Sequence, residues 1–177
     1  MELFYKPEHI FVGIDLGTSG VRTCAITEKG DVVATTTVDL ADARSSNGST
    51  SLIHEQNPEV WWSAVCCACK KLTQAIRNNG LDLTRLRTIC VDGTSGTLVA
   101  LNHLRKPVRN AIMYNDPRGA ENAVHLNQIA SEHCRNHGYR FASSFAIAKI
   151  LWLRDHEPQS FEQTELFVHQ ADFIVQR

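Results

Sequence analysis

Two short stretches of the sequence place a carboxylate beside glycines and hydroxyl side chains. Each has an acidic residue at the end of an apolar run, followed by a small polar turn: Asp15 with Gly17, Thr18, Ser19 and Gly20, and Asp92 with Gly93, Thr94, Ser95 and Gly96. Glycines let backbone N–H groups come close to an anion, and hydroxyls add further donors. Because Mg²⁺ takes one or two carboxylates and keeps several waters, one acid beside a bound phosphate is enough to hold it. The first stretch therefore predicts a phosphate and magnesium site, and the second a site for a polar ligand.

Both stretches also have a plainer interpretation as tight turns. Asp15 can cap a hairpin locally, and an Asp-Gly pair such as residues 92–93 is a frequent hairpin turn. Neither stretch matches the phosphate-binding patterns GxxxxGK[ST] or GxGxxG. Two such turns in one α/β domain nevertheless favour a site. If their strands are neighbours, both turns open at the same edge of the sheet, where α/β folds bind ligands.

A third polar stretch, YNDPRG, covers residues 114–119 and contains Asp116 and Arg118. An aspartate accepts hydrogen bonds from sugar hydroxyls, and an arginine donates several. The same residues can equally form a β-turn around Pro117 with a surface salt bridge, which contributes little to stability. The residues alone leave these two interpretations open.

Transition-metal sites are not indicated by the sequence. Cys66, Cys67 and Cys69 lie in a segment of helical pattern, where adjacent positions point in different directions. His54 and Glu55 are not followed by a second histidine at the spacing of the HExxH motif. We interpret the cysteines as small buried or half-buried thiols of a reducing compartment.

The elements that must position the polar turns form the pattern of an α/β domain with a mixed sheet. Periodicity and turn residues predict a strand over 9–16, a hairpin over 21–40, a loop over 43–51, a helix over 58–79, a strand–turn–strand unit over 87–102, a short strand over 110–116, a helix over about 120–137, a serine-capped helix ending near residue 158, and an apolar periodic segment over 167–177. The last segment stops without a cap. We expect the chain to be cut inside a longer protein, the alternative being a frayed natural end.

Composition limits the partners of the chain. Its 177 residues suffice for one domain with a sizeable core, and 18 basic residues face 19 acidic ones without long runs of either sign. This balance gives no electrostatic footprint for nucleic acid or an anionic membrane. The first residues carry charges where a signal peptide needs an apolar core, and no apolar run is long enough to span a bilayer. We expect a cytoplasmic protein.

Several stretches, in this order along the chain, resemble the FGGY carbohydrate kinases. FVGIDLGTSGVRTCAITEKGDVVA resembles the phosphate-binding hairpin that opens the family, and HEQNPEVWW is similar to its EQ-x-P-x-x-WW helix start. YNDPR stands where xylulokinase-like members have a Trp-Asn-Asp-x-Arg segment, with Tyr114 in place of the tryptophan. AKILWLRDHEP and FVHQADFIVQR resemble later family stretches. The ordered set covers nearly the whole chain and is highly specific.

The second polar turn separates the subgroups of this family. Typical xylulokinases have a Gly-Gln-Met-His-Gly segment there, and glycerol kinases have Asn-Gln-Arg-Glu. VDGTSGT resembles instead the D-ribulose kinase-like members, whereas YNDPR departs from their YNQ segment toward xylulokinase. The resemblance therefore implies a pentulose substrate, with D-ribulose ahead of D-xylulose.

The resemblance also implies a fold and a set of roles. The fold is the actin-like ATPase (ribonuclease H-like) fold, an α/β domain with a mixed sheet flanked by helices, and residues 1–177 are its N-terminal, sugar-binding half. The reaction is transfer of the γ-phosphoryl group of ATP to a sugar hydroxyl. The implied roles are metal binding and catalysis for Asp15, catalysis for Thr18, cofactor binding for Gly17, Thr18, Ser19 and Gly20, and sugar binding for Asp92, Gly93, Thr94, Ser95, Asp116 and Arg118. The catalytic base and the adenosine-binding segments belong to a second domain.

Two other classes of protein remain open. An actin- or chaperone-like ATPase can begin with a similar hairpin, but sugar would not stimulate its ATP hydrolysis, and it would need neither HEQNPEVWW nor YNDPR. A non-catalytic sugar-binding module is the third interpretation. The sequence also leaves a homodimer open.

Overall fold

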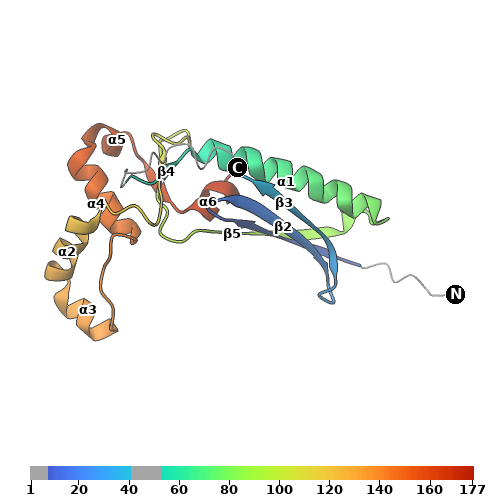
Figure 1. Cartoon of the computed structure of the whole chain (residues 1–177), viewed down its shortest axis with the longest axis horizontal. Coiled ribbons are helices and arrows are strands. Elements are labelled where there is room, and N and C mark those ends of the chain that lie inside the picture. The colour runs from blue at the N-terminus through green and yellow to red at the C-terminus, as the bar shows by residue number, and fades with distance from the viewer. Residues whose placement is uncertain (1–7, 41–52) are drawn as a thin grey trace. The chain divides into compact units, whose positions relative to one another are not determined.

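The computed structural model of the chain describes residues 8–40 and 53–177 (Figure 1). The chain forms two compact units, where the sequence predicts one domain over residues 1–177. Unit 1 comprises Met1–Asp42 and Glu59–Gly93, and unit 2 comprises Ala43–Pro58 and Thr94–Arg177. The loop predicted over residues 43–51 lies outside the described residues.

Unit 1 is built on a four-stranded mixed sheet in the order β3-β2-β1-β5. Strands β1 (Ile10–Leu16), β2 (Gly20–Thr27) and β3 (Val32–Asp39) form an antiparallel meander, and β5 (Leu86–Gly93) lies parallel to β1. Parallel neighbours need a crossover connection. Helix α1 (Pro58–Asn78) and the 3₁₀ turn η2 (Leu83–Arg85) lie in this connection. The predicted mixed sheet is confirmed.

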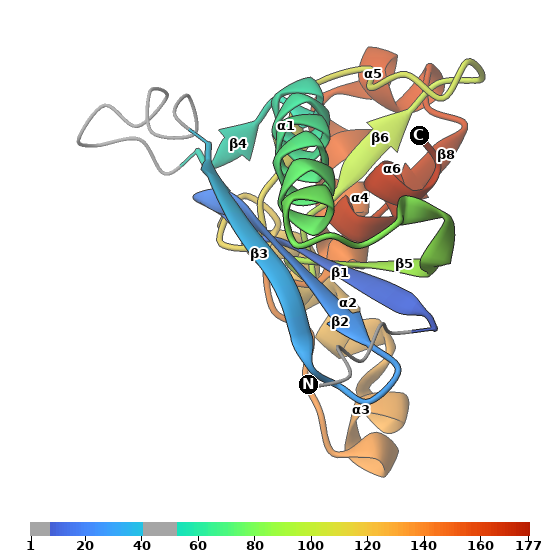
Figure 2. The ribbon, with the colours of Figure 1, turned by 90° about the vertical axis from the view of Figure 1, so that its right-hand side faces the viewer.

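Helix α1 packs on one face of this sheet (Figure 2). Alternate residues of β1 are buried, and α1 buries a stripe of helical period: Trp61, Ala64, Val65, Ala68, Leu72 and Ile76. Two hydrogen bonds join the helix region to β3, from Thr36 Oγ1 to the Ala68 carbonyl oxygen (3.2 Å) and from Asn79 Nδ2 to the Val33 carbonyl oxygen (2.7 Å). The opposite face of β1 carries the less buried residues, Phe11, Gly13 and Asp15.

Unit 2 combines short strand pairs with five helices in its described part. Strand β6 (Val99–Leu101) pairs with β8 (Leu166–Val168), and β4 (Glu55–Gln56) pairs with β7 (Ala111–Ile112), both antiparallel. The helices are α2 (Ala120–Ile129), α3 (Ser131–His137), α4 (Ala146–His156), α5 (Pro158–Glu162) and α6 (Gln170–Val175). None of the helices over residues 8–40 and 53–177 is long and apolar enough to cross a membrane.

The helix predicted over 120–137 is two helices. Ala130 separates α2 from α3, and its backbone N–H bonds to the Leu126 carbonyl oxygen. The predicted stop at Gly138 is confirmed, because this residue closes α3 in the left-handed conformation at φ 69°. The predicted serine cap of the next helix is wrong. The N-cap of α4 is Phe145, and no side chain caps it.

The apolar end of the chain is a strand followed by a helix. Its first residues pair with β6 as β8, and the helix begins only at Gln170. The periodicity of residues 167–177 does not reveal this division, because pairing with a strand some sixty-five residues earlier determines it. The first residue of this helix, Gln170, contacts the site described below.

Candidate functional site

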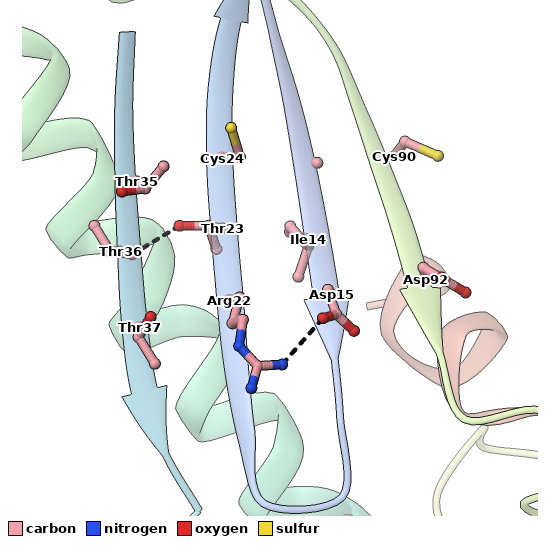
Figure 3. Close-up of a pocket in the computed structure, with 11 residues that line it drawn as sticks. Ile14, Asp15, Arg22, Thr23, Cys24, Thr35, Thr36, Thr37, Cys90 and Asp92 are labelled. Carbon is pink, nitrogen blue, oxygen red and sulfur yellow. Dashed lines mark hydrogen bonds and ion pairs between the residues drawn. The ribbon is translucent and has the colours of Figure 1, made fainter. Parts of the chain in front are cut away.

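Strands β1 and β5 bring the first two predicted turns to one edge of the sheet in unit 1. Asp15 and Asp92 are register partners across these parallel strands, whose spacing is about 4.8 Å. Both side chains are exposed and lie on the face of the sheet opposite α1 (Figure 3). The condition set in the sequence analysis, that the two strands are neighbours, is met. Two carboxylates therefore stand side by side at the carboxyl ends of the strands.

Asp15 and Asp92 line a pocket on this face of the sheet, and Arg22 of β2 is the one basic side chain among its lining residues. It is the register partner of Asp15 on the other side, and its Nη1 lies 3.3 Å from Asp15 Oδ2. Because both side chains are more than half exposed, this ion pair is worth at most about 1 kcal/mol and yields easily to a metal ion. The donor set fits Mg²⁺, which needs few protein carboxylates. Among residues 8–40 and 53–177, no group of three or more His, Cys, Asp or Glu side chains could hold a metal by itself.

The Gly17–Gly20 turn joins β1 to β2 as a tight hairpin. The Gly17 N–H donates to the Gly20 carbonyl oxygen (2.9 Å), so it is occupied inside the turn, and Thr18 and Ser19 are exposed at the tip. Neither glycine has a positive φ. A Cβ at Gly20 would lie 2.9 Å from the Val38 carbonyl oxygen, so a glycine is required there by the close approach of β3.

Next to the two carboxylates, the open face of the sheet forms a shallow pocket of about 450 Å³ (Figure 3). Gly13 leaves its floor without a side chain, between its register partners Cys24 on β2 and Cys90 on β5. A Cβ at Gly13 would meet no atom within 4 Å. We did not predict this pocket from the sequence, although a glycine in the middle of an alternating strand is a signal for it.

In unit 2 the residues after β5 form a hydrogen-bonded turn. Thr94 donates from both its backbone N–H and its Oγ1 to Gln170 Oε1, each at 2.8 Å. Its Oγ1 also lies 2.7 Å from Thr97 Oγ1, which accepts from the Tyr114 N–H at 3.2 Å. The polar groups of Thr94 are therefore used within the protein. Ser95 is exposed at the tip of the turn, and Tyr114 is 39% exposed.

Gly96 allows this turn to form. Its φ is 76°, in the left-handed region, and a Cβ there would lie 2.3 Å from the Ser144 carbonyl oxygen and 3.6 Å from Tyr114 Cβ. The turn thus packs directly on the backbone of the segment before α4. Buried Lys149 holds that segment, since its Nζ donates to the Ser143 carbonyl oxygen at 2.7 Å. Burial lowers the pKa of Lys149 to about 8, although Asp116 opposes the shift.

Replacing Gly96 with alanine is expected to destabilise the chain by roughly 2 kcal/mol or more. Left-handed backbone costs an alanine about 1–2 kcal/mol, and the contact with Ser144 adds to it. Gly138→Ala is the matched control, because Gly138 has a similar φ of 69° and open space around its Cβ position. Urea unfolding monitored by circular dichroism measures both. Equal losses for the two variants would mean that the turn does not pack as described.

The third predicted stretch is turned inward. Asp116 is fully buried and accepts four hydrogen bonds: from Arg118 N (3.0 Å) and Nε (2.9 Å) at Oδ1, and from His54 N and Arg118 Nη2 (2.8 Å each) at Oδ2. A carboxylate offers about four acceptor positions, so no acceptor is left for a sugar hydroxyl. Burial acts to raise the pKa of Asp116, but the hydrogen bonds from Arg118 and His54 hold it below its usual value.

Arg118 and its neighbours form a buried ionic cluster in unit 2. The guanidinium bonds Glu55 (2.6 Å) as well as Asp116, and it stacks on Trp152 with its Cζ 4.4 Å from the ring centroid. Arg109 pairs with Glu55 and lies 3.0 Å from Glu157. The side chain of Arg118 is only 16% exposed, so this is not the surface salt bridge of the plainer interpretation. The cluster fixes the backbone that leads from β7 past Tyr114.

A sheet of order β3-β2-β1-β5, with an acid and a small polar hairpin at the end of β1, is the arrangement of the actin-like ATPase fold. The chain belongs to the FGGY family of carbohydrate kinases. The family's N-terminal domain matches residues 10–177.

Curated relatives and a solved structure agree with this membership. The chain is 29% identical to the xylulose kinase of Bacillus subtilis (strain 168) over 92% of its own length, and 30% identical to that of Escherichia coli (strain K12) over 93%. It spans 32% of the length of either relative. The crystal structure of a xyloylose kinase from Brucella ovis superposes with a TM-score of 0.83 at 23% identity, over 94% of this chain and 34% of that one. This likeness shows the fold.

Proposed function

We propose that this chain is the sugar-binding, N-terminal part of an ATP-dependent kinase that phosphorylates a pentulose, D-ribulose ahead of D-xylulose. The observation that carries the proposal is the pairing of Asp15 with Asp92 on the exposed face of the sheet, beside a hairpin tip that exposes Thr18 and Ser19. Phosphoryl transfer depends mostly on positioning and charge stabilisation, and this edge offers ligands for both.

The residues divide into two roles under this proposal. Asp15 would hold Mg²⁺, and Thr18 and Ser19 would donate hydrogen bonds to the transferring phosphoryl group. Bound Mg²⁺ supplies positive charge that stabilises the phosphate oxygens. Asp92, at the end of β5, accepts a hydrogen bond from a sugar hydroxyl.

The turn that follows β5 directly in the chain contributes the remaining sugar contacts. Ser95 offers an exposed hydroxyl, and the ring of Tyr114 offers an exposed surface. Gly93 and Thr94 contribute to sugar binding through the backbone conformation of this turn. Asp116 and Arg118 act indirectly, since their polar groups are engaged in the buried cluster and hold Tyr114 in place.

The 177-residue chain alone is expected not to phosphorylate any sugar. It spans about a third of the kinases that it resembles, and the resemblance assigns the catalytic base and the adenosine site to another domain. Production of ADP in the presence of ATP, Mg²⁺ and each of several pentuloses measures this directly. Sugar-dependent turnover by the purified chain would contradict the prediction.

The full-length gene product is expected to prefer D-ribulose over D-xylulose by about 10-fold or more in kcat/KM. The two sugars are epimers at one carbon. A site that hydrogen-bonds one hydroxyl leaves buried polar groups unpaired with the other epimer. The DGTSGT turn, with short hydroxyls in place of a Gln-Met-His segment, supports this order. The measurement is kcat/KM for both sugars, with glycerol and L-ribulose as controls. A clear preference for D-xylulose would move the assignment to xylulokinase, and a preference for glycerol would reject a pentulose.

A further inference from the structure

Gln170 is a buried polar residue that no part of the proposed reaction uses. It lies at the start of α6 and is completely inaccessible to solvent. The antiparallel pairing of β6 with β8 places Val168 opposite Val99, and the same register continued outward brings Gln170 beside Thr97 and the turn before it. Figure 2 shows β6, β8 and α6 together. The pairing of β6 with β8 thus places the Gln170 side-chain amide at the proposed sugar-binding turn.

The orientation of the Gln170 amide is determined by its neighbours. The backbone N–H of Thr94 can only donate, so the atom that faces it at 2.8 Å is the carbonyl oxygen Oε1 and not Nε2. Nε2 is buried, and it has no hydrogen-bond partner in the part of the chain that the structure describes. Nε2 therefore contributes no hydrogen bond, and Oε1 makes both bonds between Gln170 and the turn.

Oε1 in turn fixes the direction of a chain of hydroxyls. Because it accepts the Thr94 hydroxyl proton, the proton between Thr94 and Thr97 comes from Thr97. Thr97 Oγ1 then accepts from the Tyr114 N–H. One acceptor consequently fixes the direction of both threonine hydroxyls, the second of which meets the Tyr114 N–H. Buried networks of this kind hold a single geometry.

We propose that Gln170 is a positioning residue that holds the turn of residues 94–97 and thereby sets the discrimination between pentulose epimers. It does not touch the sugar. It fixes Thr94 and Thr97, and through them the exposed Ser95 hydroxyl and the Tyr114 ring. The part of the inference that concerns the sugar rests on the proposed function, whereas the part that concerns the turn does not.

The test uses Gln170→Met in the full-length gene product, because methionine has nearly the same size and no strong acceptor. Gln176→Met, at the C-cap of the same helix, is the matched control, since Gln176 is exposed. Gln170→Glu retains the acceptor oxygen and is the rescue variant. Gln170→Asn, which shortens the reach by one methylene, provides a second variant should the methionine variant not fold. Two readouts are measured: kcat/KM for D-ribulose and D-xylulose, and deuterium exchange of peptides covering residues 91–98.

We expect Gln170→Met, or Gln170→Asn in its place, to reduce the ratio of the two kcat/KM values by about 5-fold or more, mainly through the KM of the preferred sugar, with the KM for ATP unchanged. Exchange across residues 91–98 should become faster in that variant and remain slow in Gln170→Glu and Gln176→Met. Equal losses for both sugars, or unchanged exchange, would overturn the inference. If no variant or parent phosphorylates a sugar, the proposed function fails, and the exchange result still decides whether Gln170 holds the turn.

Discussion

Replacing Asp15 with asparagine is expected to lower the kcat of the full-length enzyme by about 10²-fold or more, with little change in the KM for sugar. The variant keeps nearly the same shape but loses the charge that we propose holds Mg²⁺ beside the phosphates. A contact made mainly in the transition state lowers kcat, whereas one made equally in the ground state raises KM. Steady-state kinetics at saturating ATP and Mg²⁺ separates the two.

Asp31→Asn is the matched control for this substitution. Asp31 sits in the hairpin turn between β2 and β3, and the variant makes the same change of charge away from the β1–β5 edge. We expect its kcat to stay within about 2-fold of the parent, as for a substitution remote from the chemistry. If Asp15→Asn turned over at a near-normal rate, Asp15 would be a turn residue and not a metal ligand.

Replacing Asp116 with alanine is expected to destabilise the chain by about 3–5 kcal/mol, the usual effect of removing one partner of a buried ion pair. The variant would remove the acceptor of the His54 N–H and leave the Arg118 guanidinium with Glu55 alone of its two carboxylate partners. Urea unfolding at neutral pH measures the loss. Asp155→Ala is the control, because Asp155 pairs with Arg154 at the surface, where a salt bridge contributes at most about 1 kcal/mol. A loss for Asp116→Ala as small as that of the control would contradict the buried cluster.

The same cluster predicts a dependence of stability on pH. The pKa of Asp116 is lower in the folded chain than its usual value of 3.8, so the folded state binds fewer protons in the acidic range. Its contribution is therefore complete above the unfolded pKa and is lost as the pH falls through the folded pKa. The difference in unfolding free energy between the parent chain and Asp116→Ala should consequently shrink on acidification below about pH 4.

Local patterns in the sequence predict the main elements of unit 1. The alternation of β1 and β2, the turn at Gly30 and the apolar stripe of α1 each depend on residues close in the chain. The sequence alone did not establish that the strands before Asp15 and Asp92 are neighbours. The parallel pairing of β1 with β5 establishes it. Both turns follow strands whose carboxyl ends meet at one edge.

Unit 2 was less predictable because distant residues decide it. Asp116 and Arg118 follow a short strand and looked like ligands of a sugar, but Glu55, about sixty residues earlier, and Trp152 draw Arg118 inward. Gln170 carries no pattern that marks it as part of a site. Its hydrogen bond with Thr94 becomes apparent only when β8 pairs with β6. Long-range pairing of this kind leaves no local periodicity in the sequence.

The rate of ATP consumption by the full-length gene product, with and without D-ribulose, tests the central claim most directly. ADP formation is measured together with the sugar phosphate, in the presence of Mg²⁺. A pentulose kinase consumes ATP in step with sugar phosphate, and we expect D-ribulose to raise the rate at least about 10-fold over the sugar-free background. ATP hydrolysis that no pentulose stimulates would contradict the assignment as a pentulose kinase.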